Sequence, residues 1–401
     1  MKLTKTTLSI ATALLFSSNL MADDIADLKT EIAELKEQTQ ALIDEGANTQ
    51  TGFNYTIADN EKSYSGLGGA ASKVYYSKSP LSIGGYGEMY YSNTNNEDGT
   101  NQSETQVKRF ITYLGYKFSD NIILNTELEY EGGGVTTGGS GDEVKVEFIY
   151  IDFLMHKNLN LRAGNFLIPM GLTNQQHEPT LFTTVQRPKT SYYIIPSTWN
   201  ESGAMAYGNI IDGVEYKVAA INALQLDDAA GDKWLRSGRG GSFKVVDPKL
   251  ATLARVDYTG TNGLLLGASV YNSSDVLIWD THVDYKQNGA RLYGTYAQTS
   301  RSNETPNSTN VTESFGGYLN ASFDVLSLTS SDNKLPLFVQ YESYNPQSKR
   351  ADGTSRDATT DISLGANYFP HPQVVVKADY VMSTTNSITD NIASVSLGFI
   401  F

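Results

Sequence analysis

Apolar and polar residues alternate along most of the segment 81–401. In one example, Leu124 and Leu128 fall on one side of an extended chain, and Glu127 and Glu129 fall on the other. Because successive side chains of a β-strand point to opposite faces, this alternation predicts strands with one apolar and one polar face. About 16 such segments are found, an even number, as in bacterial outer-membrane barrels. Their centres lie near residues 86, 114, 126, 149, 163, 205, 217, 255, 268, 281, 295, 319, 340, 365, 378 and 397.

The connections between these segments alternate between short and long. Short turns such as Ser119–Asn121 and Asp212–Gly213 alternate with long connections such as 92–107, 170–200 and 222–249. Short turns at one end of a barrel and long loops at the other are typical of outer-membrane proteins. Together with the alternation of faces, this asymmetry predicts an all-β fold, a transmembrane antiparallel β-barrel of about 16 strands.

The segment 1–22 has the pattern of a secretory signal peptide. Lys2 and Lys5 precede the short apolar run Leu8–Phe16, and the small residue Ala22 ends the segment. Positive charge, a short apolar core and a small residue at the cleavage point predict export from the cytoplasm. The apolar run is too short to cross a membrane as a helix.

The next segment, 23–45, has a heptad pattern. Ile25, Leu28, Ile32 and Leu35 are spaced three and four residues apart, which predicts a short coiled-coil helix and therefore an oligomer. Isoleucine at a and leucine at d favour two strands, although an attached domain could impose three. A solvated single helix or a frayed tail is the alternative, because about three heptads are marginal for an isolated helix. The predicted organisation is a signal peptide at 1–22, a coiled-coil helix at 23–45, a linker at 46–80 rich in Gly, Ser and Asn, and a barrel at 81–401.

Composition excludes several other classes of protein. The chain has 401 residues, no cysteine and a formal net charge of −14. The lack of cysteine excludes a disulfide framework and thiolate metal sites. An acidic exported chain argues against nucleic acid as a partner.

One connection differs from the others in composition. The stretch 159–203 contains Pro169, Pro179, Pro188 and Pro196, and it is rich in Phe, Tyr, Leu and Ile. Disordered linkers lack such apolar residues, and a long connection in a compact domain is commonly functional. We therefore expect the loop at 170–200, the third long loop along the barrel, to be ordered and packed against the barrel wall.

The motifs of this stretch resemble those of the phosphate-selective porin O/P family of outer-membrane porins. The run GNFLIPMGL at 164–172 is similar to that family's G-x-F-x-x-P-x-G-L strand end. The runs at 177–179, 187–188 and 194–199 are similar to sequences of related porins. The resemblance implies a trimeric porin of the Gram-negative outer membrane, with a third loop that folds inward. It also implies passive diffusion of small hydrophilic solutes, anions such as phosphate among them, with no cofactor.

Candidate pore residues follow from the resemblance and from strand parity. Arg187 and Lys189 in the inward loop are the main constriction candidates, with Arg162 behind them, because the arginine fork suits oxyanions. Alternatively, Arg187 pairs with Glu178 or with a carboxylate of the barrel and only holds the loop. The cations and acids predicted on the polar faces balance, so phosphate selectivity does not follow from charge alone. The candidate constriction or anion-binding residues are Arg187, Lys189, Arg162, Arg109, Arg255 and Arg291.

No catalytic or metal site is predicted. His282 shares a strand face with Asp280 and Asp284, which could hold a metal ion, but a solvated lumen wall is the preferred interpretation. Two other functions remain open beside a general porin. One is a substrate-specific channel for organic acids or other small nutrients, and the other is a plugged structural or adhesin barrel.

Overall fold

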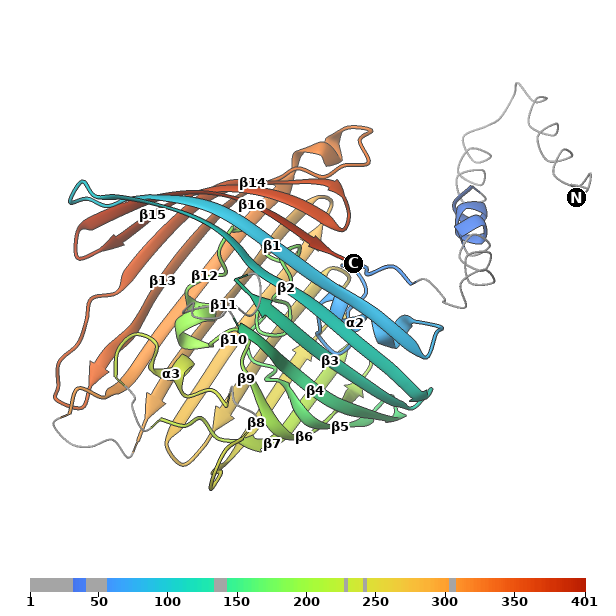
Figure 1. The fold of residues 1–401 in the computed structure, drawn as a ribbon, viewed down its shortest axis with the longest axis horizontal. Helices are drawn as coiled ribbons and strands as arrows, with labels where there is room; N and C mark the ends of the chain where they lie inside the picture. Colours follow the sequence, from blue (N-terminus) through green and yellow to red (C-terminus); the bar gives the residue numbers. More distant parts are fainter. Residues whose placement is uncertain (1–31, 41–55, 133–142, 227–229, 241–243, 303–307) are drawn as a thin grey trace, which may run out of the picture. The chain divides into compact units, whose positions relative to one another are not determined.

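The computed structural model describes residues 32–40, 56–132, 143–226, 230–240, 244–302 and 308–401. From residue 56 onward the chain forms one compact unit, in which 16 antiparallel strands close into a barrel (Figure 1). The strands are β1 Leu81–Asn95, β2 Asn101–Ser119, β3 Ile122–Glu131, β4 Glu143–His156, β5 Leu159–Leu167, β6 Asn200–Ile211, β7 Val214–Asn222, β8 Leu250–Tyr258, β9 Leu264–Asn272, β10 Val276–Gln287, β11 Ala290–Arg301, β12 Val311–Asp324, β13 Pro336–Arg350, β14 Thr359–His371, β15 Val374–Thr385 and β16 Ile388–Ile400. In the described part of this unit, four short helical elements accompany them: α2 Gly69–Tyr76, the π-helical turn η1 Thr190–Ile194, α3 Trp234–Ser237 and the 3-10 turn η2 Val325–Leu328.

The predicted barrel is confirmed. Each of the 16 predicted strand centres lies inside one observed strand, and each strand pairs with its neighbours in sequence. The last strand closes on the first, with Tyr86 opposite Ile400. A closed barrel leaves no unpaired strand edge, which is the condition for crossing a bilayer with strands.

The exposure of the side chains is the reverse of that in a water-soluble protein. On the outer face Leu319 is 50% exposed and Tyr341 is 55% exposed, whereas the inward Glu127 is 0% exposed and Lys217 is 2% exposed. Apolar residues outside and charged residues inside identify a transmembrane barrel whose outer face contacts lipid. None of the helices in the described part of the chain is long and apolar enough to cross a membrane.

Two predicted long loops are shorter than expected. The connection predicted at 92–107 is mostly strand, because β1 continues to Asn95 and β2 starts at Asn101, with Tyr90 paired opposite Gln106. Beyond the membrane both faces of a strand are polar, so the alternation of apolar and polar residues disappears while the pairing continues. For the same reason β13 extends to Arg350, although the alternation predicts a long connection at 345–359.

The predicted linker at 46–80 is different in its described part. Residues 56–80 pack against the inner wall at the end of the barrel that has the short turns, and Asn60 there donates to the carbonyl of Pro372 at 2.9 Å. They include α2, whose residues from Gly69 to Val74 are buried. Of the predicted coiled coil, residues 32–40 are helical, and the rest lies outside the described residues. The number of strands in a coiled coil stays a prediction.

A missing side chain in β2 makes room for α2. A Cβ atom placed on Gly115 would lie 2.4 Å from Cγ2 of Val74, and the side-chain amide of Asn125 donates to the carbonyl of Ala71 at 2.9 Å. Glycine therefore permits the close approach of the helix to the wall.

We expect Gly115→Leu to displace α2 from the wall. Overpacking of this kind costs about 1–3 kcal/mol, so the labelling rate of a cysteine introduced at Val74 should rise at least about fivefold. The chain has no cysteine of its own, so maleimide labelling reports this one position. Leu114→Phe, a change on the outer face, is the matched control and should leave labelling unchanged. Equal labelling of the Gly115→Leu and control proteins would show that α2 does not depend on this contact.

Candidate pore constriction

The connection between β5 and β6, residues 168–199, is the third long loop and is called L3 here. Its two ends are joined by Asn174, whose side-chain amide donates to the carbonyl of Ile168 at 2.6 Å and to that of Trp199 at 2.9 Å. The backbone N–H of Trp199 donates back to Oδ1 of Asn174 at 2.8 Å. Because most L3 residues are buried and bond to strands on several sides, L3 packs inside the barrel.

Carboxylates of the barrel wall accept hydrogen bonds from the L3 backbone. A buried loop must satisfy its N–H groups, and inward-facing acids provide the acceptors. The donors and acceptors are Gly171 to Asp280 at 3.0 Å, Val185 to Asp379 at 2.7 Å, Lys189 to Glu342 at 3.0 Å and Thr190 to Glu342 at 2.6 Å. These acids therefore hold the loop as well as lining the wall.

Two of the predicted pore cations also hold L3. Arg255 donates to the carbonyl of Gly171 at 2.6 Å, and Arg291 donates to that of Leu181 at 2.7 Å. Each is also paired with a wall carboxylate, Arg255 with Asp257 at 2.7 Å and Arg291 with Asp284 at 2.9 Å. Both face inward as strand parity predicts, but their donors are used in positioning the loop.

Arg109 and Arg162 are paired as well. Arg109 lies 3.1 Å from Glu88 and 3.4 Å from Glu129. Arg162 forms two hydrogen bonds of 2.8 Å with Asp152, and its guanidinium lies 3.9 Å from the ring centroid of Tyr150. It also reaches the hydroxyl of Tyr75 in α2 at 3.4 Å. Its described contacts are therefore with the wall and α2 rather than with L3.

Arg187 and Lys189 differ from the four wall arginines. Nη2 of Arg187 donates to the carbonyl of His177 at 3.0 Å, and its buried Nε has no hydrogen-bond acceptor among the described residues. Neither Arg187 nor Lys189 forms an ion pair with any residue that the structure describes. Among the described residues Arg187 forms no ion pair with Glu178, whose carboxylate accepts from the N–H groups of Ala70 and Ala71 in α2, at 3.1 and 3.0 Å.

Two further lysines contact L3. Strand parity does not place one of them, Lys108, inside the barrel, because Lys108 lies in a β-bulge. In the pairing of β1 with β2, Glu88 is opposite Arg109 and Met89 is opposite Val107, so Lys108 is the extra residue of a β-bulge. The bulge turns Lys108 inward beside Arg109, where its ammonium binds the side chain of Gln186 in L3. A bulge leaves no mark in the alternation of apolar and polar residues.

Lys377 in β15 follows ordinary parity and was recoverable from the sequence. Its ammonium donates to the carbonyls of Phe182 and Thr184 at 2.7 and 3.0 Å. Lys108 and Lys377 thus contact the L3 residues Gln186 and Thr184, which lie one and three positions before Arg187 in the chain. We call Lys108, Arg187, Lys189 and Lys377 the L3 cation cluster.

The possible metal site at His282 is not formed. Its Nδ1 lies 2.7 Å from Asp280 and its Nε2 lies 2.9 Å from Asp257, so each ring nitrogen contacts a wall carboxylate, and the two carboxylates lie on opposite sides of the ring. Asp284 binds Arg291 instead.

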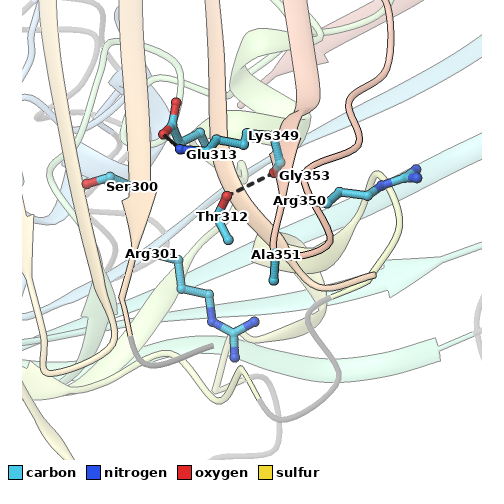
Figure 2. A pocket seen from close by; sticks show the side chains of 8 residues that line it. All are labelled: Ser300, Arg301, Thr312, Glu313, Lys349, Arg350, Ala351 and Gly353. Carbon is cyan, nitrogen blue, oxygen red and sulfur yellow. Dashed lines mark hydrogen bonds and ion pairs between the residues drawn. The ribbon is translucent and has the colours of Figure 1, made fainter. Parts of the chain in front are cut away.

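A cleft of about 230 Å³ lies near the long-loop end of β11, β12 and β13 (Figure 2). Arg301, Arg350 and Lys349 contribute positive charge to its lining, and Glu313, the one acid among the lining residues, pairs with Lys349 at 3.0 Å. The residues that line this cleft therefore carry a net positive charge.

The barrel and its inward loop define a class, the outer-membrane porin fold. An anion-selective porin from Comamonas acidovorans superposes with a TM-score of 0.55 at 13% identity, over 80% of this chain and 99% of that chain. The outer-membrane channel DcaP of Acinetobacter baumannii gives a TM-score of 0.54 at 12% identity, over 80% and 97%. OmpF of Salmonella typhi, in complex with daunomycin, gives 0.51 at 12% identity, also over 80% and 97%.

No family model matches the sequence. An uncharacterized protein of Aquifex aeolicus is 33% identical over 362 residues, which cover 82% of each chain. The chain belongs to the same protein family as this relative.

Proposed function

We propose that the protein is a passive channel of the Gram-negative outer membrane for small hydrophilic solutes, with a preference for anions. The observation that carries the proposal is the L3 cation cluster, in which Arg187 and Lys189 have no acid paired with them among the described residues. Charged rings and clusters at a pore constriction set the sign of the permeating ion. The same proposal includes export by a signal peptide at 1–22, a coiled-coil helix at 23–45 and assembly as a homotrimer.

The distribution of wall charges supports an anion preference although acids and cations are balanced in number. Asp280, Asp379 and Glu342 accept hydrogen bonds from L3 backbone N–H groups, which offsets part of their negative charge. Arg187 keeps a free buried Nε and has the planar fork that binds oxyanions. Phosphate, the solute implied by the resemblance to the phosphate-selective porin O/P family, fits this arrangement.

A narrower, substrate-specific channel is the second candidate. L3 and α2 both occupy the interior and are joined through Glu178, which bonds to Ala70 and Ala71. Such packing favours a selective path for small organic acids or similar nutrients over a wide general pore. The same cation cluster would serve these anionic solutes.

Reversal potentials in a KCl gradient across a planar bilayer test the proposal. We expect the wild-type potential to have the sign for chloride preference, and Arg187→Gln to lower the chloride-to-potassium permeability ratio. One unit charge at about 4 Å in water contributes about 1 kcal/mol, so the decrease should be up to about fivefold. Lys157→Gln is the control, because Lys157 is 66% exposed in a turn.

A potential with the sign for potassium preference would overturn the anion preference. A folded barrel without conductance would instead favour the plugged structural barrel and overturn the channel itself.

A further inference from the structure

Three buried side chains meet where L3 approaches β3 and β4. Glu127, Glu147 and His177 are 0%, 1% and 2% exposed. One carboxylate oxygen of each glutamate and a ring nitrogen of His177 all lie within 4.8 Å of one another. Nε2 of His177 lies 3.5 Å from Oε1 of Glu127.

The tautomer of His177 follows from its other contact. Nδ1 lies 2.8 Å from the carbonyl oxygen of Asn174, which can only accept a hydrogen bond, so Nδ1 carries the proton. Nε2 of the neutral ring then has a lone pair, and that lone pair is directed at the two carboxylates. An imidazole held by a backbone carbonyl on one nitrogen is the usual arrangement of a histidine that binds metal with the other.

One oxygen of each carboxylate also lacks a hydrogen-bond partner. Oε2 of Glu127 and Oε2 of Glu147 are buried and receive no hydrogen bond from the described residues. The oxygens of the neighbouring inward acid, Glu129, also receive no hydrogen bond from the described part of the chain, but Glu129 forms ion pairs with Arg109 at 3.4 Å and with Lys145 at 3.2 Å. Buried acceptors without a donor are costly, and a cation between them would remove the cost.

A β-bulge brings Glu147 into the group. Glu127 is opposite Phe148 and Leu128 is opposite Val146, so Glu147 is the extra residue of β4. Both Glu147 and Phe148 are buried as a result. Bulges of this kind commonly re-aim a side chain beside a functional site.

We propose that Glu127, Glu147 and His177 bind one divalent transition-metal ion through two carboxylate oxygens and one imidazole nitrogen. Three protein ligands of this kind, with an open position for water, suit Zn²⁺. Mg²⁺ and Ca²⁺ prefer oxygen ligands alone, so they bind less well. Because His177 belongs to L3 and the glutamates belong to the wall, the bound ion ties the loop to β3 and β4.

Zinc titration of the purified full-length protein in detergent, after EDTA treatment and dialysis, tests this site without reference to the permeating solute. We expect one Zn²⁺ per chain by calorimetry, retained in excess Mg²⁺, and a Co²⁺ absorption spectrum typical of a nitrogen-containing site. Glu147→Gln keeps the shape of the side chain and removes its charge, and His177→Ala removes the nitrogen ligand. Each should weaken zinc binding at least about tenfold.

His371→Ala is the matched control, because His371 is exposed at the end of β14. It should leave the affinity unchanged. No saturable zinc binding, displacement by Mg²⁺, or unchanged affinity in Glu147→Gln would overturn the proposal. If His177→Ala fails to fold, Glu127→Gln replaces it, and the same loss of zinc affinity is expected. Unchanged zinc affinity in Glu127→Gln would overturn the proposal.

Discussion

Arg162→Ala should destabilise the barrel by about 3–5 kcal/mol, the range for removing one partner of a buried ion pair. The guanidinium is 0% exposed and forms two hydrogen bonds of 2.8 Å with Asp152, which is also 0% exposed. Its removal leaves a buried carboxylate without its counter-charge and removes the stacking on Tyr150. It also breaks the contact with Tyr75, which joins α2 to the wall.

Urea unfolding in detergent, followed by tryptophan fluorescence, measures this loss. Lys157→Ala removes an exposed ion pair, 3.5 Å from Asp212, and should cost less than about 1 kcal/mol. The double variant Arg162→Ala with Asp152→Ala should be less destabilised than the sum of the single variants, because neither charge is then left alone. A cost for Arg162→Ala no larger than that for Lys157→Ala would contradict a structural role for the buried pair.

The second large effect is expected for Glu178→Ala. The Glu178 carboxylate is the acceptor for the buried N–H groups of Ala70 and Ala71, and an unsatisfied buried donor costs about 1–3 kcal/mol. We therefore expect a loss of about 2–4 kcal/mol in the free energy of unfolding. Burial raises the pKa of Glu178, and hydrogen bonds from the N–H groups of α2 oppose that rise.

Glu178→Gln is the matched variant, because it keeps one acceptor oxygen without the charge. It should retain more of the stability than Glu178→Ala in the same urea experiment. Single-channel recordings should show more frequent conductance fluctuations for Glu178→Ala, since L3 and α2 are then no longer joined. Identical stability and identical recordings of the two variants would show that the contact between Glu178 and α2 does not hold the two segments together.

Much of the barrel was predictable because the alternation of apolar and polar residues can be read within each strand alone. A strand with lipid on one side and a polar interior on the other repeats every two residues, so Arg109, Arg255 and Arg291 could be placed inward without any tertiary information. The composition of 159–203 also marked L3 as a packed segment. The partners of these side chains could not be found in this way, because L3 can contact any strand of a closed barrel.

Residues placed by β-bulges were beyond such reasoning. Lys108 and Glu147 each fall next to a residue that faces inward by parity, and alternation would place both toward lipid. The bulge depends on how two strands pair along their length, which the sequence of one strand does not contain. These two positions supply a member of the L3 cation cluster and a ligand of the proposed metal site.

The packing of α2 inside the barrel was hidden for a different reason. Residues 56–80 are rich in Gly and Ser and have weak periodicity, so they look like a linker. Their contacts, Val74 with Gly115 and Ala70 with Glu178, join residues that are distant in the sequence.

The sequence by itself determined the transmembrane barrel, its number of strands and its polar interior. The reason is that each strand needs apolar side chains on the face toward lipid and polar side chains on the face toward the lumen. Only the tertiary structure decided which interior charges remain available. It showed that Arg255 and Arg291 hold L3, that Arg162 is paired beside α2, and that Arg187 and Lys189 form no ion pair with a described residue. These outcomes depend on long-range contacts between a loop and a closed wall, which no local pattern specifies.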